Sequence, residues 1–162
     1  LTPMLLGTAR FGGGLAATGL LLVMVSLVNS GKWKHPVWIW PVVLLSVKGV
    51  MQLGASIVPS SFWQSDPGLR VLYLHILLLG GLTLVVFAWY NKRTNVPQIF
   101  FLLLSIAIVT TLITLVMFTS IWPPILSGAW IVDALALGAL LPILAAIIYW
   151  IKLIQSLRKI HN

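Results

Sequence analysis

Five side chains of this 162-residue sequence combine ionisable or amide groups with an apolar setting, so they are the residues with the means to do chemistry. They are Arg10, Lys48, Gln52, His75 and Asp133. A charged group at the centre of a membrane helix costs about 2.5–3.5 kcal/mol, and it therefore usually has a partner or a role. Lys48 and Gln52 are four residues apart, so they share one face of a helix.

The spacing of these residues predicts a polar cluster in the outer half of the membrane. Counted from the expected outer ends of their helices, Lys48 and Asp133 lie about 14–15 Å deep, and Gln52 and His75 about 9 Å deep. Asp133 is the only carboxylate expected inside the membrane, so we predict that it is the counter-ion of Lys48. The cluster then either binds a proton, a quinone or a small solute, or holds the helices in register. In the second case His75 donates to Gln52 or to a backbone carbonyl.

Metal and cofactor chemistry is limited by the absence of Cys and by the presence of only three His. Without Cys there is no thiolate metal site, and the membrane segments lack a set of two His and one carboxylate. A bis-histidine haem needs a second imidazole at the same membrane depth as His75. His35 and His161 instead lie at the other surface of the membrane, far from that depth. We therefore expect no cofactor held by this chain alone. A haem on His75 would be five-coordinate or would take its second ligand from another subunit, and a bound lipid or quinone is compatible with the cluster.

The composition identifies the elements that must position these side chains. The chain is 60% hydrophobic and only 7% charged, with a mean hydropathy of +1.08. A soluble domain carries about 25% charged residues, so this is an integral membrane protein of the all-α class. Its net charge of +8 does not indicate nucleic-acid binding, because the basic residues stand at the ends of apolar runs.

Five apolar segments are long enough to cross a bilayer, which needs about 20 residues in a helix. They predict one transmembrane domain over residues 1–162, in the form of a five-helix bundle. Because the sequence begins with Leu, we expect it to be part of a longer chain. The segments are Phe11–Val28 (or from Pro3), Val37–Val58, Leu69–Trp89, Gln98–Ile121 and Pro124–Ile151, the last two joined by a tight turn at Trp122-Pro123-Pro124.

The basic residues predict the orientation. Five spans place the loops after the first and third helices on the same side as the C-terminus. That side carries Lys32, Lys34, Lys92, Arg93, Lys152, Arg158 and Lys159, whereas the other carries Arg10 and Arg70. By the positive-inside rule the C-terminus is cytoplasmic and the N-terminus outside, in a multi-pass protein of a bacterial cytoplasmic (inner) membrane.

Small residues predict where helices approach one another closely. They give the first, third and fifth segments faces with small side chains, as is usual for contacts between membrane helices. Pro142 removes the hydrogen bond to the carbonyl of Gly138 and is expected to kink the fifth helix. The small residues are Gly12, Gly13, Gly14, Ala16, Ala17 and Gly19, then Gly80 and Gly81, then Ala134 and Gly138.

Part of the third segment resembles a known helix. The stretch from Arg70 to Gly80 is similar to the Tyr-x-His-x-x-x-x-Gly helix of multi-span bacterial membrane proteins that are distant relatives of haem–copper oxidase subunit I and of NnrS-like haem/copper proteins. The stretch Lys48-Gly-Val-Met-Gln52-Leu-Gly-Ala-Ser resembles the same pattern. The oxidases carry several membrane histidines and this chain carries one. The resemblance therefore implies a fragment or degenerate relative rather than a working oxidase.

Three functions are consistent with these residues. The first is a non-catalytic or accessory subunit of a bacterial-type respiratory or redox membrane complex that takes part in electron transport. The second is a half or a protomer of a secondary transporter that binds an ion or a small anionic solute at a Lys48–Asp133 pair. The third is an assembly scaffold. In each case the expected partners are the lipid bilayer and other membrane subunits or further copies of the chain, and no nucleic acid.

Overall fold

The computed structural model describes residues 3–31, 36–58, 65–94 and 96–161, and these residues form helices and their connections. Five of the helices are long and apolar enough to span a membrane, which confirms the prediction of an all-helical protein with five such segments. They are α1 (Pro3–Asn29), α2 (Pro36–Ile57), the continuous helix α4–η2–α5 (Pro67–Arg93), α6 (Gln98–Val116) and α7 (Trp130–His161).

The third span changes its winding in the middle. It runs through α4 (Pro67–His75), the π-helical segment η2 (Ile76–Thr83) and α5 (Leu84–Arg93). Two glycines of η2 face α2 at close range. A Cβ at Gly80 would lie 2.9 Å from Leu44 Cδ1, and one at Gly81 would lie 2.6 Å from Leu45 Cδ2. The glycine pair thus brings the two helices together as predicted, whereas the π-helical winding was not predicted.

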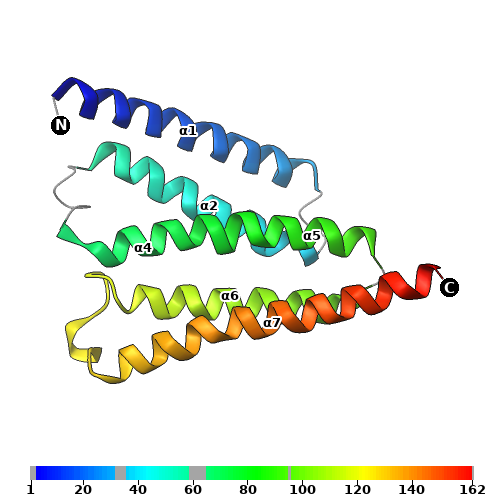
Figure 1. Cartoon of the computed structure of the whole chain (residues 1–162). Coiled ribbons are helices and arrows are strands. Elements are labelled where there is room, and N and C mark those ends of the chain that lie inside the picture. The colour runs from blue at the N-terminus through cyan, green and yellow to red at the C-terminus, as the bar shows by residue number, and fades with distance from the viewer. Residues whose placement is uncertain (1–2, 32–35, 59–64, 95, 162) are drawn as a thin grey trace.

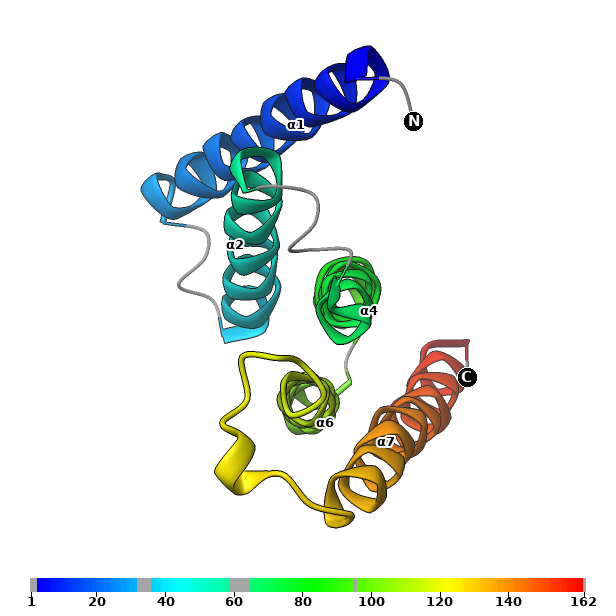
Figure 2. The same cartoon turned by 90° about the vertical axis from the view of Figure 1, so that its left-hand side faces the viewer.

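The helices form an open arc instead of a closed bundle (Figures 1 and 2). α1 packs on α2, α2 packs on the third span, the third span packs on α6, and α6 packs on α7. The C-terminal half of α7 also contacts α5, where the rings of Tyr149 and Phe87 meet edge to face with their centres 4.8 Å apart. The apolar core lies between α2 and α7 and includes Leu44, Leu72, Ile76, Leu84, Leu104, Ile108 and Tyr149. Consequently α1 and α7 are the most exposed helices.

The connection between α6 and α7 is longer than predicted. α6 ends at Val116 instead of Ile121, and α7 begins at Trp130 instead of Pro124 and continues to His161 instead of Ile151. Only a 3₁₀ turn, η3 (Pro124–Leu126), lies between them, so the predicted tight turn is wrong. Thr119 bonds to neighbouring backbone groups, and the two prolines that follow lack N–H donors; both features disfavour a helix here. At the other end, α7 continues beyond its apolar run because a helix need not stop at the membrane surface.

The charged residues are distributed between the two ends of the helices. The end of α1, the end of α5 at Arg93 and the end of α7 lie together at one side (Figure 1). This is the grouping that the basic residues predicted, with Lys92, Arg93 and Arg158 exposed there. Lys32 and Lys34 lie outside the described residues. The opposite side holds the N-terminus and the connection between α6 and α7.

Candidate functional site

Lys48 is buried in α2, with only 8% of its surface exposed. Its Nζ donates a hydrogen bond to Oε1 of Gln52, one helical turn further along. The same Nζ lies 5.0 Å from the ring centre of Tyr73 in α4, a distance at which the face of the ring attracts a cation. The ammonium group is therefore held by an amide and an aromatic ring.

Gln52 connects three helices. Its Oε1 also accepts a hydrogen bond from the Tyr73 hydroxyl at 3.1 Å, and its Nε2 donates to the backbone carbonyl of Gly13 in α1 at 3.1 Å. We refer to Lys48, Gln52, Tyr73 and the Gly13 carbonyl as the polar cluster. Because every member bonds to Gln52, this one amide fixes the positions of α1, α2 and α4 relative to one another.

Asp133 does not join the polar cluster. It is an exposed residue in the first turn of α7, about 5 Å from the start of that helix at Trp130, whereas Lys48 lies about 14 Å from the end of α2 at Ile57. The expected equal depth was wrong because α7 begins later than Pro124. Between the described residues no ion pair forms with Lys48, and a carboxylate near a helix N-terminus is favourable on its own.

His75 is also separate from the polar cluster. Its Nδ1 lies 2.8 Å from the carbonyl of Val71 in the same helix, and its side chain is partly exposed. It is thus bonded to a backbone carbonyl, one of the two partners expected for it, and not to Gln52. In the part of the chain that the structure describes, no group of three His, Cys, Asp or Glu side chains is placed to hold a metal ion.

Two basic residues line open grooves on either side of the polar cluster. Arg10 lines a groove of about 390 Å³ between α1 and α2, and its Nη2 donates to the carbonyl of Val58 at 3.4 Å. Arg70 and Tyr73 line another of about 310 Å³ together with Ala55 and Leu74. The N-terminal part of α1, the C-terminal part of α2 and α4 therefore carry several positive charges, namely Arg10, Lys48 and Arg70.

Asp66, the second of the two acidic residues, makes its hydrogen bonds away from the polar cluster. It is buried at the N-cap of α4, where its Oδ1 accepts from the backbone N–H of Leu69 at 3.0 Å and its Oδ2 from that of Ser120 at 2.7 Å. Burial raises the pKa of Asp66, but the hydrogen bonds from Ser120, Leu69 and Gly68 outweigh it and hold the pKa below its ordinary value. Asp66 therefore fixes the start of α4 to the connection after α6.

Tyr73 is the member of the polar cluster that the sequence analysis did not select. It occurs there only in the resemblance to the Tyr-x-His helix. Counting residues would have found it, since Tyr73 lies about 9 Å from the start of α4 and Gln52 about 8 Å from the end of α2. No sequence pattern predicts the hydrogen bond to the Gly13 carbonyl, because every residue has a carbonyl.

No protein family, curated protein or solved structure matches this chain. Its function is therefore inferred from its own residues and their geometry.

Proposed function

We propose that this chain is a non-catalytic accessory subunit of a larger membrane complex of the respiratory or redox type, and that α1 binds a helix of a partner subunit. The observation that carries the proposal is a face of α1 formed by Gly12, Ala16 and Gly19. These residues are spaced i, i+4 and i+7, so they lie on one side of the helix. We refer to them as the small face.

In the part of the chain that the structure describes, the small face takes no part in packing against another helix. All three residues are exposed, and a Cβ added at Gly12 or Gly19 would meet nothing within 4 Å. The opposite side of α1 packs on α2 through buried Ala17 and Met24. A glycine costs about 1 kcal/mol relative to alanine within a helix. In membrane proteins, faces of this kind occur where a second helix approaches closely.

The polar cluster supports the same proposal. Interhelical hydrogen bonds such as Gln52 to Gly13 and Gln52 to Tyr73 hold α1 in a fixed position on α2 and α4. A peripheral helix that is held in this way presents its outer face in one orientation, as a docking surface requires. The cluster is thus structural in this proposal, and the chemistry belongs to the partner subunits.

The test is native mass spectrometry of the protein extracted gently from its own membrane. The expected result is co-migration with other subunits, at least one of which shows haem, flavin or iron–sulfur absorption. Gly12→Leu with Gly19→Leu should release the partner, because both substituents fit the free chain but block a close helix. Ala139→Leu on the exposed side of α7 is the matched control and should leave the complex intact. A cofactor-free monomer or homodimer of the native chain would contradict the proposal.

A second function, anion transport, is favoured by the buried ammonium of Lys48. Its described contacts are an amide oxygen and an aromatic ring, with no carboxylate to balance its charge. Burial of a charge without a counter-ion is costly, and an anion from solution would supply one. Uptake of small anions into proteoliposomes should then disappear in Lys48→Met and persist in Lys92→Met, whose side chain is exposed. Uptake that is absent from the native protein, or unaltered by Lys48→Met, would exclude this function.

A further inference from the structure

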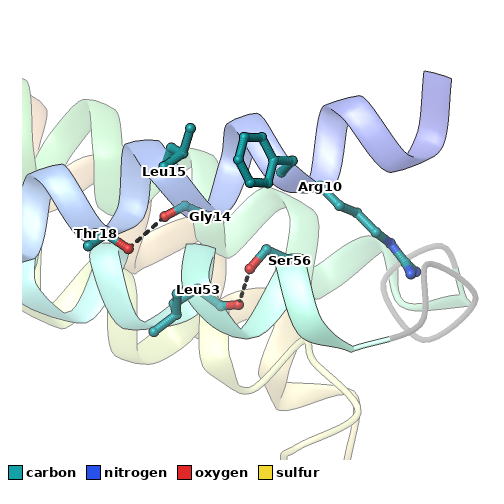
Figure 3. A pocket seen from close by; sticks show the side chains of 7 residues that line it. Arg10, Gly14, Leu15, Thr18, Leu53 and Ser56 are labelled. Atoms are coloured by element: carbon teal, nitrogen blue, oxygen red, sulfur yellow. Dashed lines mark hydrogen bonds between the residues drawn. The ribbon is translucent and has the colours of Figure 1, made fainter. Parts of the chain in front are cut away.

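The groove between α1 and α2 has one charged end and an otherwise apolar lining. Its apolar residues are Phe11 and Leu15 of α1 and Leu53 of α2, and Arg10 lies at its outer end (Figure 3). Two hydroxyls also line it, but each is bonded within its own helix. Thr18 donates to the Gly14 carbonyl at 2.9 Å and Ser56 to the Leu53 carbonyl at 2.7 Å. The groove therefore offers a single cation and little other polar character.

Among the described residues, the charge of Arg10 has no counter-ion. A guanidinium group has five N–H donors, and the described residues supply one acceptor, the Val58 carbonyl, at the long distance of 3.4 Å. The sequence contains two carboxylate side chains. Asp66 is bonded to Leu69 and Ser120, and Asp133 belongs to α7 at the far end of the arc. Among the described residues, four donors of Arg10 thus have no acceptor, and an anion from outside the chain would supply one.

The two ends of the groove lie at the depths of two different layers of a membrane leaflet. The apolar part of α1 begins at Gly7, so Arg10 lies about 5 Å inside it, at the level where lipid headgroups meet the hydrocarbon. Thr18, at the inner end of the groove, lies about 12 Å deeper, among the acyl chains. The charged end is thus level with lipid phosphates, and the apolar end is level with hydrocarbon.

We propose that this groove is a binding site for an anionic phospholipid. The guanidinium of Arg10 binds the phosphate through two parallel N–H···O hydrogen bonds, a geometry that arginine favours. One acyl chain lies along Leu15 and Leu53. The site faces away from the small face of α1, so it does not depend on the proposed subunit contact.

Native mass spectrometry of the delipidated protein in detergent, titrated with dipalmitoyl phosphatidylglycerol, tests this site. We expect one lipid to bind before all others, and Arg10→Gln to weaken that first binding about tenfold. Thr18→Trp, which fills the inner end of the groove without altering Arg10, should weaken it as well. Arg70→Gln is the charge-matched control from the same side of the membrane and should change the first binding less than twofold.

Three results would overturn the proposal. Equal losses in Arg10→Gln and Arg70→Gln would mean that lipid binds by general electrostatic attraction. Unaltered binding in Thr18→Trp would mean that no acyl chain occupies the groove. Displacement of the lipid by millimolar inorganic phosphate would mean that the site recognises a free anion. Ser26→Trp, an exposed position on α1 outside the groove, controls for the effect of a bulky substituent.

Discussion

The hydroxyl of Thr111 in α6 lies 2.5 Å from the carbonyl oxygen of Gly138 in α7 and 3.0 Å from that of Ala107 in its own helix, and it donates its one hydrogen to the nearer oxygen, that of Gly138. This carbonyl is the one that Pro142 leaves without a donor, since proline has no N–H to close the helical turn. A side chain of one helix thus completes the backbone hydrogen bonding of another. The contact also ties α7, which is exposed over most of its length, to the buried helix α6.

Thr111→Val should destabilise the protein by about 1 kcal/mol, because it leaves the Gly138 carbonyl without a donor and preserves the shape of the side chain. The measurement is the free energy of unfolding in mixed micelles with increasing sodium dodecyl sulfate. In a Pro142→Ala background the backbone N–H returns, so the effect of Thr111→Val should shrink by more than half. Thr110→Val is the control, because Thr110 bonds only to Ile106 within α6. An equal effect of Thr111→Val in both backgrounds would contradict this account.

Gly138→Ala should cost about 1–3 kcal/mol in the same assay. A Cβ at this position would lie 2.6 Å from Oγ1 and 3.3 Å from Cβ of Thr114, so α6 and α7 would have to move apart. Thr114→Ala should restore most of the loss, because it removes the nearer of these atoms. Failure of the double variant to recover would show that the cost arises elsewhere in α7.

Gln52→Leu should destabilise the protein by about 1–3 kcal/mol, because it leaves Lys48 without its amide acceptor and the Tyr73 hydroxyl without a partner. Adding Lys48→Met to Gln52→Leu should recover part of the stability, since an apolar pair replaces a buried charge. Unfolding in mixed micelles again provides the measurement. Gln155→Leu is the control, because Gln155 is exposed and its one hydrogen bond among the described residues is with Lys152. The prediction fails if the two glutamine variants are equally stable.

The lowered pKa of Asp66 predicts that the protein loses stability in acid. Its pKa is lower in the folded protein than the value of about 3.9 in an unfolded chain, so the carboxylate stabilises the fold above that value. This contribution is lost as the pH falls through the folded pKa. Asp66→Asn should therefore lower the unfolding free energy at pH 7 and flatten its decrease between pH 5 and 2. An equal decrease in Asp66→Asn and in the parent protein would contradict this prediction.

The orientation predicted from the basic residues is open to a direct test, because the parent chain has no Cys. Ser127→Cys, in the exposed connection before α7, should react with a membrane-impermeant maleimide added to intact cells. Lys92→Cys, exposed at the end of α5, should react only after the membrane is permeabilised. The reverse pattern would place the C-terminus outside.

Which segments are long and apolar enough to cross a membrane was predictable, whereas where the helices end was not. Hydropathy identifies residues that prefer lipid, but helix ends depend on backbone hydrogen bonds, such as those of Thr119 after α6. The predicted depth of Asp133 depended on such an end and was therefore wrong. The Lys48–Gln52 contact follows from helical spacing alone. The contacts of Gln52 with Tyr73 and Gly13 depend on how α1, α2 and α4 are rotated, which no local pattern specifies.

The open arc also determines the order in which the protein is able to assemble. Each span has its principal contacts with the span that precedes it in the sequence, so no span has to wait for a distant one. During synthesis every helix after the first already has its partner in the membrane when it enters, and the contacts close over short stretches of chain. The N-terminal pair of helices should thus dock before the last helix has left the ribosome.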